Sequence, residues 1–226
     1  MPAHLTALPM IKAVLFDLDG TFADTAPDLC YALNRMREAR RLAPVALEAT
    51  RPVTSLGARG LLGAGFNITP DDPGYLSMRE EFLMFYEQNL CRYTQLFPGV
   101  SELIDALDLR GLRWGIVTNK AERFAKPLLD LLRVGNRAAC VIGGDTTGRL
   151  KPDPEPLLAA SRVLAIAPGA CVYIGDDRRD IEAGRAAGMK TVAVEYGYLN
   201  GSVPADWGAD AIIGHPQELQ ELLQHL

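Results

Sequence analysis

Two aspartates one residue apart interrupt an apolar run near the start of the sequence. In "AVLFDLDGTFADT" (residues 13–25), Asp17 and Asp19 follow four apolar residues, and Gly20 and Thr21 come next. The apolar run predicts a buried strand, and a buried carboxylate needs a partner because desolvation and like charges both disfavour its ionised form. We therefore expect a cation or a set of donors at this end of the strand.

Three other segments carry polar residues at the ends of predicted strands. They are "TNK" (118–120), "LKPDP" (150–154) and "GDDRRD" (175–180). Each has an ordinary structural explanation, such as a helix cap or a solvated loop cation. In an open α/β sheet, however, the carboxyl ends of the strands share one crevice, so these segments are expected to meet. The candidate site residues are Asp17, Asp19, Thr118, Asn119, Lys120, Lys151, Asp176, Asp177 and Asp180.

Several carboxylates without accompanying histidines are typical of a site for a hard divalent cation. Mg²⁺ prefers a few carboxylates together with water and phosphate oxygens, and it would relieve the repulsion between the acids. A carboxylate nucleophile, a lysine, and hydroxyl or amide donors are also what phosphoryl transfer requires. The residue types therefore predict Mg²⁺-dependent chemistry on a phosphate ester.

The elements that position these residues are strands and helices in alternation. Six short apolar runs lack polar alternation, which indicates a parallel sheet covered on both faces. Helical patterns separate the later runs, so we predict an α/β fold with a doubly wound, Rossmann-like parallel sheet. The runs are residues 11–17, 113–119, 138–144, 170–177, 190–196 and 209–214.

One interval is too long for this pattern. About 100 residues separate Asp17 from Thr118, whereas a βαβ unit needs only about 30. Residues 26–41, 55–64 and 75–91 have helical spacing. We therefore predict an all-helical cap domain at 24–95, inserted into an α/β core formed by 1–23 and 96–226.

Composition excludes several classes of function. The 226 residues carry 23 Lys and Arg against 28 Asp and Glu, a net charge of −5, and no basic run that would bind nucleic acid. No apolar stretch approaches the roughly 20 residues that span a membrane, and residues 1–12 do not resemble a secretory signal. The four cysteines form no C-x-x-C pair, so we expect buried free thiols and a cytoplasmic protein. The sequence leaves the oligomeric state open.

The motifs "DLDGT", "VTN", "LKPDP" and "GDDRRD", in this order, resemble the four signatures of the haloacid dehalogenase superfamily of phosphohydrolases. The insertion after the first motif resembles the helical cap of one subgroup. "VTNKAERFAKPLL" and "KPDPEPLL" are most similar to bacterial phosphoglycolate phosphatases. "YGYLN", "DWGAD" and "HPQEL" also resemble N-acetylmuramic acid 6-phosphate phosphatase, which is the alternative. The resemblance implies a small phosphorylated metabolite as substrate.

The resemblance also assigns roles to the first motif and to the metal site. Asp17 would be the nucleophile that forms an aspartyl-phosphate, and Asp19 would be the general acid and then the general base. The backbone carbonyl of Asp19 would hold Mg²⁺ together with Asp17 and Asp176. The residues expected to support this arrangement are Gly20, Thr21, Asp177 and Asp180.

Other residues would bind the phosphate and the rest of the substrate. By the same resemblance, Thr118 and Asn119 would bind phosphate oxygens, and Lys151 would neutralise the developing charge. Arg59, in the loop "TSLGARG" (54–60), and Lys120 are candidate substrate contacts; a surface arginine at a helix start is the simpler explanation of Arg59.

Two alternatives to a phosphatase remain at this stage. A sugar phosphomutase uses the same nucleophile and cap, and product analysis distinguishes it because no inorganic phosphate is released. A non-enzymatic phospho-acceptor switch also places acids, a threonine and a lysine at parallel strand ends. Such domains have about half this length and no insertion after the first strand, which argues against the switch.

Overall fold

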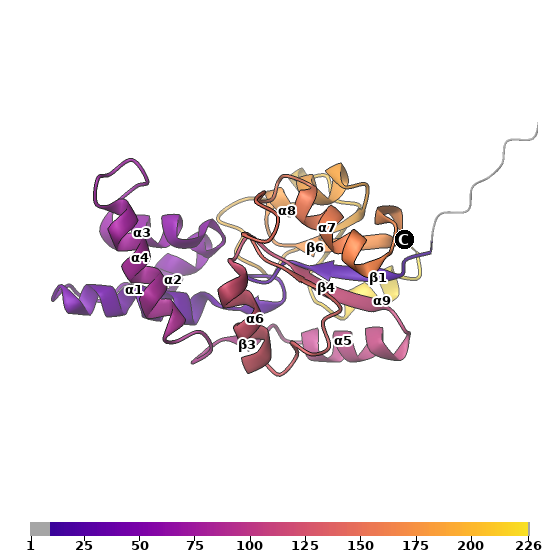
Figure 1. Ribbon diagram of the computed structural model, residues 1–226, viewed down its shortest axis with the longest axis horizontal. Coiled ribbons are helices and arrows are strands. Elements are labelled where there is room, and N and C mark those ends of the chain that lie inside the picture. The colour runs from indigo at the N-terminus through magenta and orange to yellow at the C-terminus, as the bar shows by residue number, and fades with distance from the viewer. Residues whose placement is uncertain (1–9, 226) are drawn as a thin grey trace, which may run out of the picture.

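A six-stranded, entirely parallel sheet forms the centre of the molecule. The computed structural model describes residues 10–225. Most of the segment 1–12, which we compared with a secretory signal, therefore lies outside the described range, as does the first of the three histidines, His4. The strand order is β5-β4-β1-β6-β7-β8, which confirms the predicted doubly wound α/β fold (Figure 1). The strands are β1 (Ala13–Phe16), β4 (Arg113–Val117), β5 (Val141–Ile142), β6 (Cys171–Gly175), β7 (Lys190–Val194) and β8 (Ala211–Ile213).

Strand β1 lies between β4 and β6. Phe16 is in register with Ile116 of β4 and with Ile174 of β6, and all three strands run in the same direction. The carboxyl ends of β1, β4 and β6 therefore lie at one edge of the sheet, and the polar residues that follow them are brought together there.

Alternate residues of β1 point to opposite faces of the sheet, and helices cover both faces. Val14 and Phe16 pack in one apolar cluster with α5 (Val100–Leu109), α6 (Glu122–Leu131) and α9 (Glu218–Leu222). Ala13 and Leu15 pack in another with α7 (Glu155–Leu164) and α8 (Arg178–Ala186). In Figure 1, α7 and α8 lie on one side of the sheet, and α5 and α9 on the other. Burial on both faces explains why the strands lack polar alternation.

Two elements are shorter than their sequence patterns indicate. The apolar run 138–144 contributes only the two residues of β5, which lies at the sheet edge and pairs with β4 alone. Gly143 ends this strand, and a Cβ at that position would lie 2.6 Å from the backbone nitrogen of Glu122. The helical pattern of residues 215–226 is longer than the helix found there, because α9 has only the five residues Glu218–Leu222.

The long insertion is helical. It contains α1 (Ala26–Ala39), α2 (Leu47–Thr50), a 3-10 helix (Arg51–Leu56), α3 (Gly57–Phe66) and α4 (Tyr75–Glu87). Helices α1, α3 and α4 share an apolar cluster of their own, which also includes Phe124 of α6, whereas Leu47 of α2 packs against the apolar cluster of the core. We call residues 26–87 the helical unit; Figure 1 shows it beside the sheet rather than stacked on either face. The domain boundaries at residues 24 and 95 remain a prediction.

Two short strands join the helical unit to the core. Strand β2 (Ala23–Asp24) pairs in antiparallel fashion with β3 (Gln95–Leu96), so the chain enters and leaves the unit at neighbouring points. Asp28, which is fully buried, accepts hydrogen bonds from the backbone nitrogens of Tyr93 and Thr94 and from the Thr94 hydroxyl. The entry to the unit is thereby fastened to its exit.

The remaining expectations from composition concern cysteines and membrane spans. All four cysteines are free; Cys30, Cys140 and Cys171 are buried as predicted, and Cys91 is half-buried. Within residues 10–225, every helix is too short or too polar to cross a bilayer.

Candidate active site

The turn after β1 places the first acidic motif against the end of β6. The backbone nitrogen of Asp17 donates to the carbonyl of Ile174 at 2.8 Å, which continues the sheet up to the aspartate. Gly20 has φ +87°, and a Cβ there would lie 2.1 Å from Asp176 Oδ2. Only glycine permits both this backbone conformation and this close approach. The sequence order D-L-D-G therefore brings Asp17 beside Asp176.

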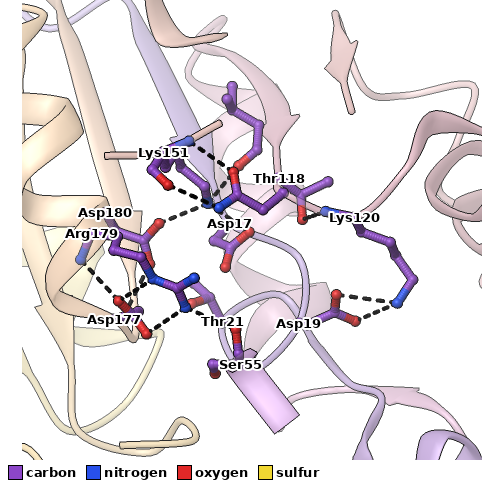
Figure 2. A network of polar contacts seen from close by, with 12 residues as sticks. Asp17, Asp19, Thr21, Ser55, Thr118, Lys120, Lys151, Asp177, Arg179 and Asp180 are labelled. Carbon is purple, nitrogen blue, oxygen red and sulfur yellow. Dashed lines mark hydrogen bonds and ion pairs between the residues drawn. The ribbon is translucent and has the colours of Figure 1, made fainter. Parts of the chain in front are cut away.

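Three carboxylates and one lysine form the centre of the site, and Figure 2 shows Asp17, Asp180 and Lys151 among them. Asp17, Asp176 and Asp180 each have a carboxylate oxygen within 4.8 Å of the other two. Lys151 Nζ lies 2.9 Å from Asp17 Oδ1 and 2.7 Å from Asp180 Oδ1. The buried Oδ1 of Asp17 nevertheless accepts no hydrogen bond of ordinary geometry from any described residue.

The electrostatics of the cluster favour an additional positive charge. Burial, followed by the charges of Asp17 and Asp180, raises the pKa of Asp176 well above its ordinary value. Burial likewise raises the pKa of Asp180 to about 6, although Lys151 opposes the shift. Burial alone would lower the pKa of Lys151, but Asp17 and Asp180 raise it, so the lysine stays charged. One ammonium therefore does not fully compensate three carboxylates.

Lys151 is held from several sides. Its ammonium donates to the Tyr173 hydroxyl at 2.7 Å and to the carbonyl of Val117 at 3.2 Å. The side-chain amide of Asn119 donates to the Lys151 carbonyl and accepts from the Lys151 nitrogen, at 3.0 and 2.9 Å. Asn119 thus fixes the loop that carries Lys151, a role the sequence did not indicate. Its predicted contact with phosphate stays a prediction.

Asp176 is oriented by donors from three parts of the chain. Its Oδ1 accepts from the Thr21 hydroxyl at 3.1 Å. Its Oδ2 accepts from the Tyr198 backbone nitrogen at 2.7 Å and from the Ser55 hydroxyl at 3.2 Å. Ser55 belongs to the helical unit, so this unit contacts the acidic cluster directly.

The helix after β6 is capped by acids of the same motif. Asp177 is the N-cap of α8; its side chain accepts from the backbone nitrogen of Arg179, while Asp180 accepts from the backbone nitrogen of Asp177. The Arg179 guanidinium donates to both Asp177 oxygens and, at 2.8 Å, to the carbonyl of Ser55. Asp177 therefore caps α8 and also holds the Arg179 side chain in place. Arg179 in turn connects the core to the helical unit through its hydrogen bond to Ser55.

Asp19 lies apart from the acidic cluster and has its own partners (Figure 2). Lys120 Nζ lies 2.9 Å from Oδ1 and 3.1 Å from Oδ2, and the Thr25 hydroxyl donates to Oδ1 at 2.6 Å. The Thr118 hydroxyl accepts from the Lys120 backbone nitrogen and lines the same pocket. Asp17 and Asp19, which only Leu18 separates in the motif, thus face different cations.

A pocket of about 550 Å³ connects this site with the helical unit. Asp17, Asp19, Thr118 and Lys151 line one end, and α3 and α4 line the other. The solvent-exposed residues Arg59, Arg79 and Arg123 also line it, and within residues 10–225 none of these arginines forms an ion pair. Arg59 and Arg79 belong to the helical unit and Arg123 to α6, so the pocket wall away from the acidic cluster is positively charged.

The structure brings the predicted strand-end residues together, but other contacts were missed. Ser55, Tyr86, Arg179 and Tyr198 complete the surroundings of the site. Nothing in the local sequence distinguishes them, because each acts through a contact with a segment far away along the chain.

The donor set fits a divalent cation. Three carboxylates converge within 4.8 Å of one another, two of them have raised pKa values, and Lys151 is the cation that pairs with two of the three, Asp17 and Asp180. Oxygen-only ligands of this kind suit Mg²⁺. The convergence of the Asp17 and Asp176 carboxylates, away from Lys151, is the place for the ion.

Known proteins are similar to this chain over nearly its whole length. The chain is 46% identical over 214 residues to an N-acetylmuramic acid 6-phosphate phosphatase of Pseudomonas aeruginosa, covering 94% of this chain and 95% of that protein. It is 44% identical over 211 residues to a phosphoglycolate phosphatase of Xanthomonas campestris pv. campestris, covering 93% and 95%. The crystal structure of a predicted phosphoglycolate phosphatase from Haemophilus somnus has the same fold, with a TM-score of 0.84 at 24% identity over 96% and 99% of the two chains.

The family model described as haloacid dehalogenase-like hydrolase matches residues 14–194, from β1 to the end of β7. This range contains all four acidic and basic segments at the strand ends, as well as the helical insertion. The fold, the order of the segments and the match agree: the chain belongs to the haloacid dehalogenase-like hydrolase family.

Proposed function

We propose that the protein is a phosphatase that hydrolyses a small phosphorylated metabolite through an aspartyl-phosphate on Asp17. The observation that carries the proposal is the separation of the two motif aspartates. Asp17 lies beside Lys151 in the buried cluster, whereas Asp19 faces Lys120 in the pocket. We assign the attack on phosphorus to Asp17 and the exchange of a proton with the leaving oxygen to Asp19.

In the first step, a carboxylate oxygen of Asp17 forms a bond to phosphorus while the bond from phosphorus to the leaving oxygen breaks. Asp19 in its protonated form gives the leaving oxygen its proton, and an alcohol departs. In the second step, Asp19 takes a proton from water as the water attacks the phosphorus atom of the aspartyl-phosphate. Inorganic phosphate leaves and Asp17 is restored. Lys151 and the Thr118 hydroxyl stabilise the charge on the phosphoryl oxygens.

We assign the metal site to Asp17, Asp176 and the backbone carbonyl of Asp19, with Asp180 in support. Bound Mg²⁺ would neutralise phosphoryl charge and the mutual repulsion of the carboxylates. Asp180 also pairs with Lys151 and completes the cap of α8. Asp180 therefore helps to hold the Lys151 ammonium 2.9 Å from Asp17 Oδ1.

We propose a carboxylate-bearing substrate, because the arginines of the pocket wall are suited to a second anionic group. A volume of about 550 Å³ lies in the range of pockets for drug-sized ligands. A phosphorylated amino-sugar acid, the substrate class named for the Pseudomonas relative, uses this space better than a two-carbon acid. Phosphoglycolate is the second candidate, supported by the Xanthomonas relative and by the motif resemblance.

We propose that the protein acts in the cytoplasm, because free thiols such as those of its cysteines stay reduced there. Within residues 10–225 the four cysteines are unpaired, and the helices offer no membrane span. We propose no nucleic-acid partner, and the oligomeric state is left open.

The test is phosphate release from N-acetylmuramate 6-phosphate and phosphoglycolate in the presence of Mg²⁺, with wild type, Asp17→Asn and the surface control Asp105→Asn. Among residues 10–225, the only ion-pair partner of Asp105 is Arg137, on the protein surface. We expect Asp17→Asn and EDTA to abolish phosphate release and Asp105→Asn to retain it. Full turnover by Asp17→Asn contradicts the mechanism. A moved phosphoryl group without phosphate release indicates a mutase instead.

A further inference from the structure

The pocket wall that the helical unit contributes carries cations and no acids. Its charged residues are Arg59 and Arg79, and among residues 10–225 neither of them forms an ion pair. Every acidic residue that lines the pocket within this range belongs to the core: Asp17, Asp19, Asp145, Asp177 and Asp180. A ligand that reaches from the acidic cluster to the helical unit therefore meets positive charge at its far end.

One face of α4 forms much of this wall. The residues of α4 that line the pocket are Tyr75, Arg79, Phe82, Leu83 and Tyr86. Their spacing of four, three, one and three residues places them on a single face of the helix. The three glutamates of α4 do not line the pocket. Arg79 is therefore the one charged residue on a face that is otherwise aromatic or aliphatic.

Arg79 lies well away from the reacting end of the pocket. At that end, the ring centroid of Tyr86 lies 4.5 Å from the ammonium of Lys120, which contacts Asp19. Arg79 precedes Tyr86 by seven residues, which is about 10 Å along the helix axis. Figure 1 shows that the C-terminal end of α4 is the end nearer to the sheet. An apolar strip of α4 thus separates the Arg79 guanidinium from the place of reaction.

The other two arginines of the pocket occupy different surroundings. Arg59 comes four residues after Ser55, whose hydroxyl contacts the acidic cluster, so its place in the chain is toward the reacting end. Arg123 belongs to α6, and Asp145 accepts a hydrogen bond from the backbone at the start of that helix. An acid thus shares the side of the pocket on which Arg123 lies. Arg79 has the surroundings best suited to a distant carboxylate.

We propose that Arg79 selects a long sugar-acid substrate by binding a carboxylate at the end opposite to the phosphate. The inference rests on the proposed function, since the phosphate must lie at Asp17. In phosphoglycolate one carbon carries both groups, so its carboxylate is too close to the phosphate to reach Arg79. In N-acetylmuramate 6-phosphate a sugar ring and a lactyl ether separate the two groups. The C–H and methyl groups of this substrate lie along the apolar strip of α4, and the guanidinium receives the carboxylate through paired hydrogen bonds.

The test removes the carboxylate from the substrate and the guanidinium from the protein in turn. We would measure kcat/KM with Mg²⁺ for N-acetylmuramate 6-phosphate, for N-acetylglucosamine 6-phosphate, which lacks the lactyl carboxylate, and for phosphoglycolate. The proteins are wild type, Arg79→Gln, Arg79→Lys and Arg59→Gln. Arg35→Gln is the matched control, because Arg35 is an exposed arginine of the same helical unit that pairs with Glu38 and does not line the pocket.

The readout is the ratio of kcat/KM between the two sugar phosphates. Wild type should prefer the sugar acid by roughly 10- to 100-fold, the usual effect of hydrogen bonds to a charged group. Arg79→Gln should bring this ratio to within about 3-fold of unity, and it should lower kcat/KM far less for phosphoglycolate than for the sugar acid. Arg79→Lys should recover part of the ratio, since lysine keeps the charge but lacks the planar fork. Arg35→Gln should show the wild-type ratio.

Four results would overturn the inference while leaving the proposed function intact. They are a wild type that does not distinguish the two sugar phosphates, a wild type that hydrolyses phosphoglycolate alone, an Arg79→Gln variant that keeps the wild-type ratio, and a loss of the ratio in Arg59→Gln as large as in Arg79→Gln. A wild type that releases phosphate from none of the three esters overturns the proposed function and this inference with it.

Discussion

Arg51 and Asp24 form a two-pronged ion pair at the junction between the helical unit and the core. Arg51 Nη1 and Nη2 lie 2.9 and 3.0 Å from the two oxygens of Asp24. Tyr198, in the loop after β7, donates its hydroxyl to Asp24 at 2.6 Å, and its ring lies under the Arg51 guanidinium at 5.7 Å. The strand that leads into the helical unit, the unit itself and the core thus meet at one carboxylate.

Replacing Arg51 should loosen the helical unit more than it destabilises the fold. The Arg51 and Asp24 side chains are 37% and 27% exposed, so we expect Arg51→Gln to cost no more than about 1 kcal/mol in the free energy of unfolding. The substrate should bind several-fold more weakly, because the pocket wall is held less often in the closed position. Urea unfolding and the KM for the alkyl phosphates measure the two effects.

The matched control for Arg51 is Arg40→Gln. Arg40 makes a similar pair with Glu81, but both residues lie inside the helical unit. Its loss should leave KM unchanged. An equal rise of KM in both variants would show that the junction has no special role.

Removing the buried lysine should damage both stability and turnover. Lys151 is 4% exposed and pairs with Asp17 and Asp180, so Lys151→Met leaves two buried carboxylates without their partner. We expect a loss of about 3–5 kcal/mol in the free energy of unfolding. Turnover should fall by roughly 10²–10³-fold, the usual effect of losing one charge-stabilising group.

Lys190→Met serves as the comparison for the Lys151 variant. Lys190 pairs with Asp210 at the surface, where both side chains are about one-third exposed, and the expected cost is below about 1 kcal/mol. Denaturant unfolding of the two variants, with and without Mg²⁺, gives the stabilities. Equal losses at these two positions would contradict the burial argument.

Mg²⁺ should bind more tightly as the pH rises from 5 to 7.5. Burial raises the pKa of Asp180 to about 6 and raises that of Asp176 well above its ordinary value, so both carboxyls hold protons at low pH. Metal binding displaces these protons, which strengthens apparent affinity by about tenfold per pH unit for each proton released. Isothermal titration calorimetry in two buffers of different ionisation enthalpy measures affinity and proton release together.

The same shifts predict how the metal-free fold responds to pH. A carboxyl whose pKa is higher in the folded than in the unfolded state stabilises the fold at low pH, and this contribution is lost as the pH rises through about 6. Mg²⁺ should therefore raise the melting temperature more at pH 7.5 than at pH 5. An equal rise at both values, or proton release of zero, would contradict the assignment.

Gly20→Ala should impair the metal site by steric conflict. The residue has φ +87°, and its new Cβ would lie 2.1 Å from Asp176 Oδ2, so Asp176 must move. We expect Mg²⁺ affinity and turnover to fall by at least about 10-fold, since Asp176 then leaves its position in the cluster. Gly111→Ala is the control: it has φ +67° but nothing within 4 Å of the added carbon. An equal loss of Mg²⁺ affinity in both variants would show that backbone strain, and not the contact with Asp176, is the cause, and unchanged affinity in Gly20→Ala would contradict the prediction.

Much of the site could be predicted, because the apolar runs indicate the strands and the parallel topology indicates which strand ends meet. The continuous apolar runs indicate a parallel sheet, and the acidic segments follow them directly, so Asp17, Asp176 and Lys151 had to converge. The helical insertion also followed from the spacing. The length of β5 could not be predicted, because a strand at the edge of the sheet ends where its partner and its glycines allow.

The contacts across the junction could not be read from the sequence. Arg179 follows two aspartates and looks like a residue on the surface of a helix, yet it donates to the carbonyl of Ser55, 124 positions away. Asn119 looked free to bind phosphate, whereas its amide pairs with the backbone of Lys151. Such roles depend on the relative placement of two packed units, which hydrophobic periodicity does not encode.

The antiparallel pair β2–β3 gives the insertion neighbouring ends. Ala23 is paired with Leu96, and Asp28 closes the base of the unit by accepting bonds from Thr94. Everything between these strands is thus a module that a short turn could replace without shifting the register of the six-stranded sheet. An exchange of this module for that of a relative would change the part of the pocket that α3 and α4 line, and would leave the strand order around Asp17 as it is.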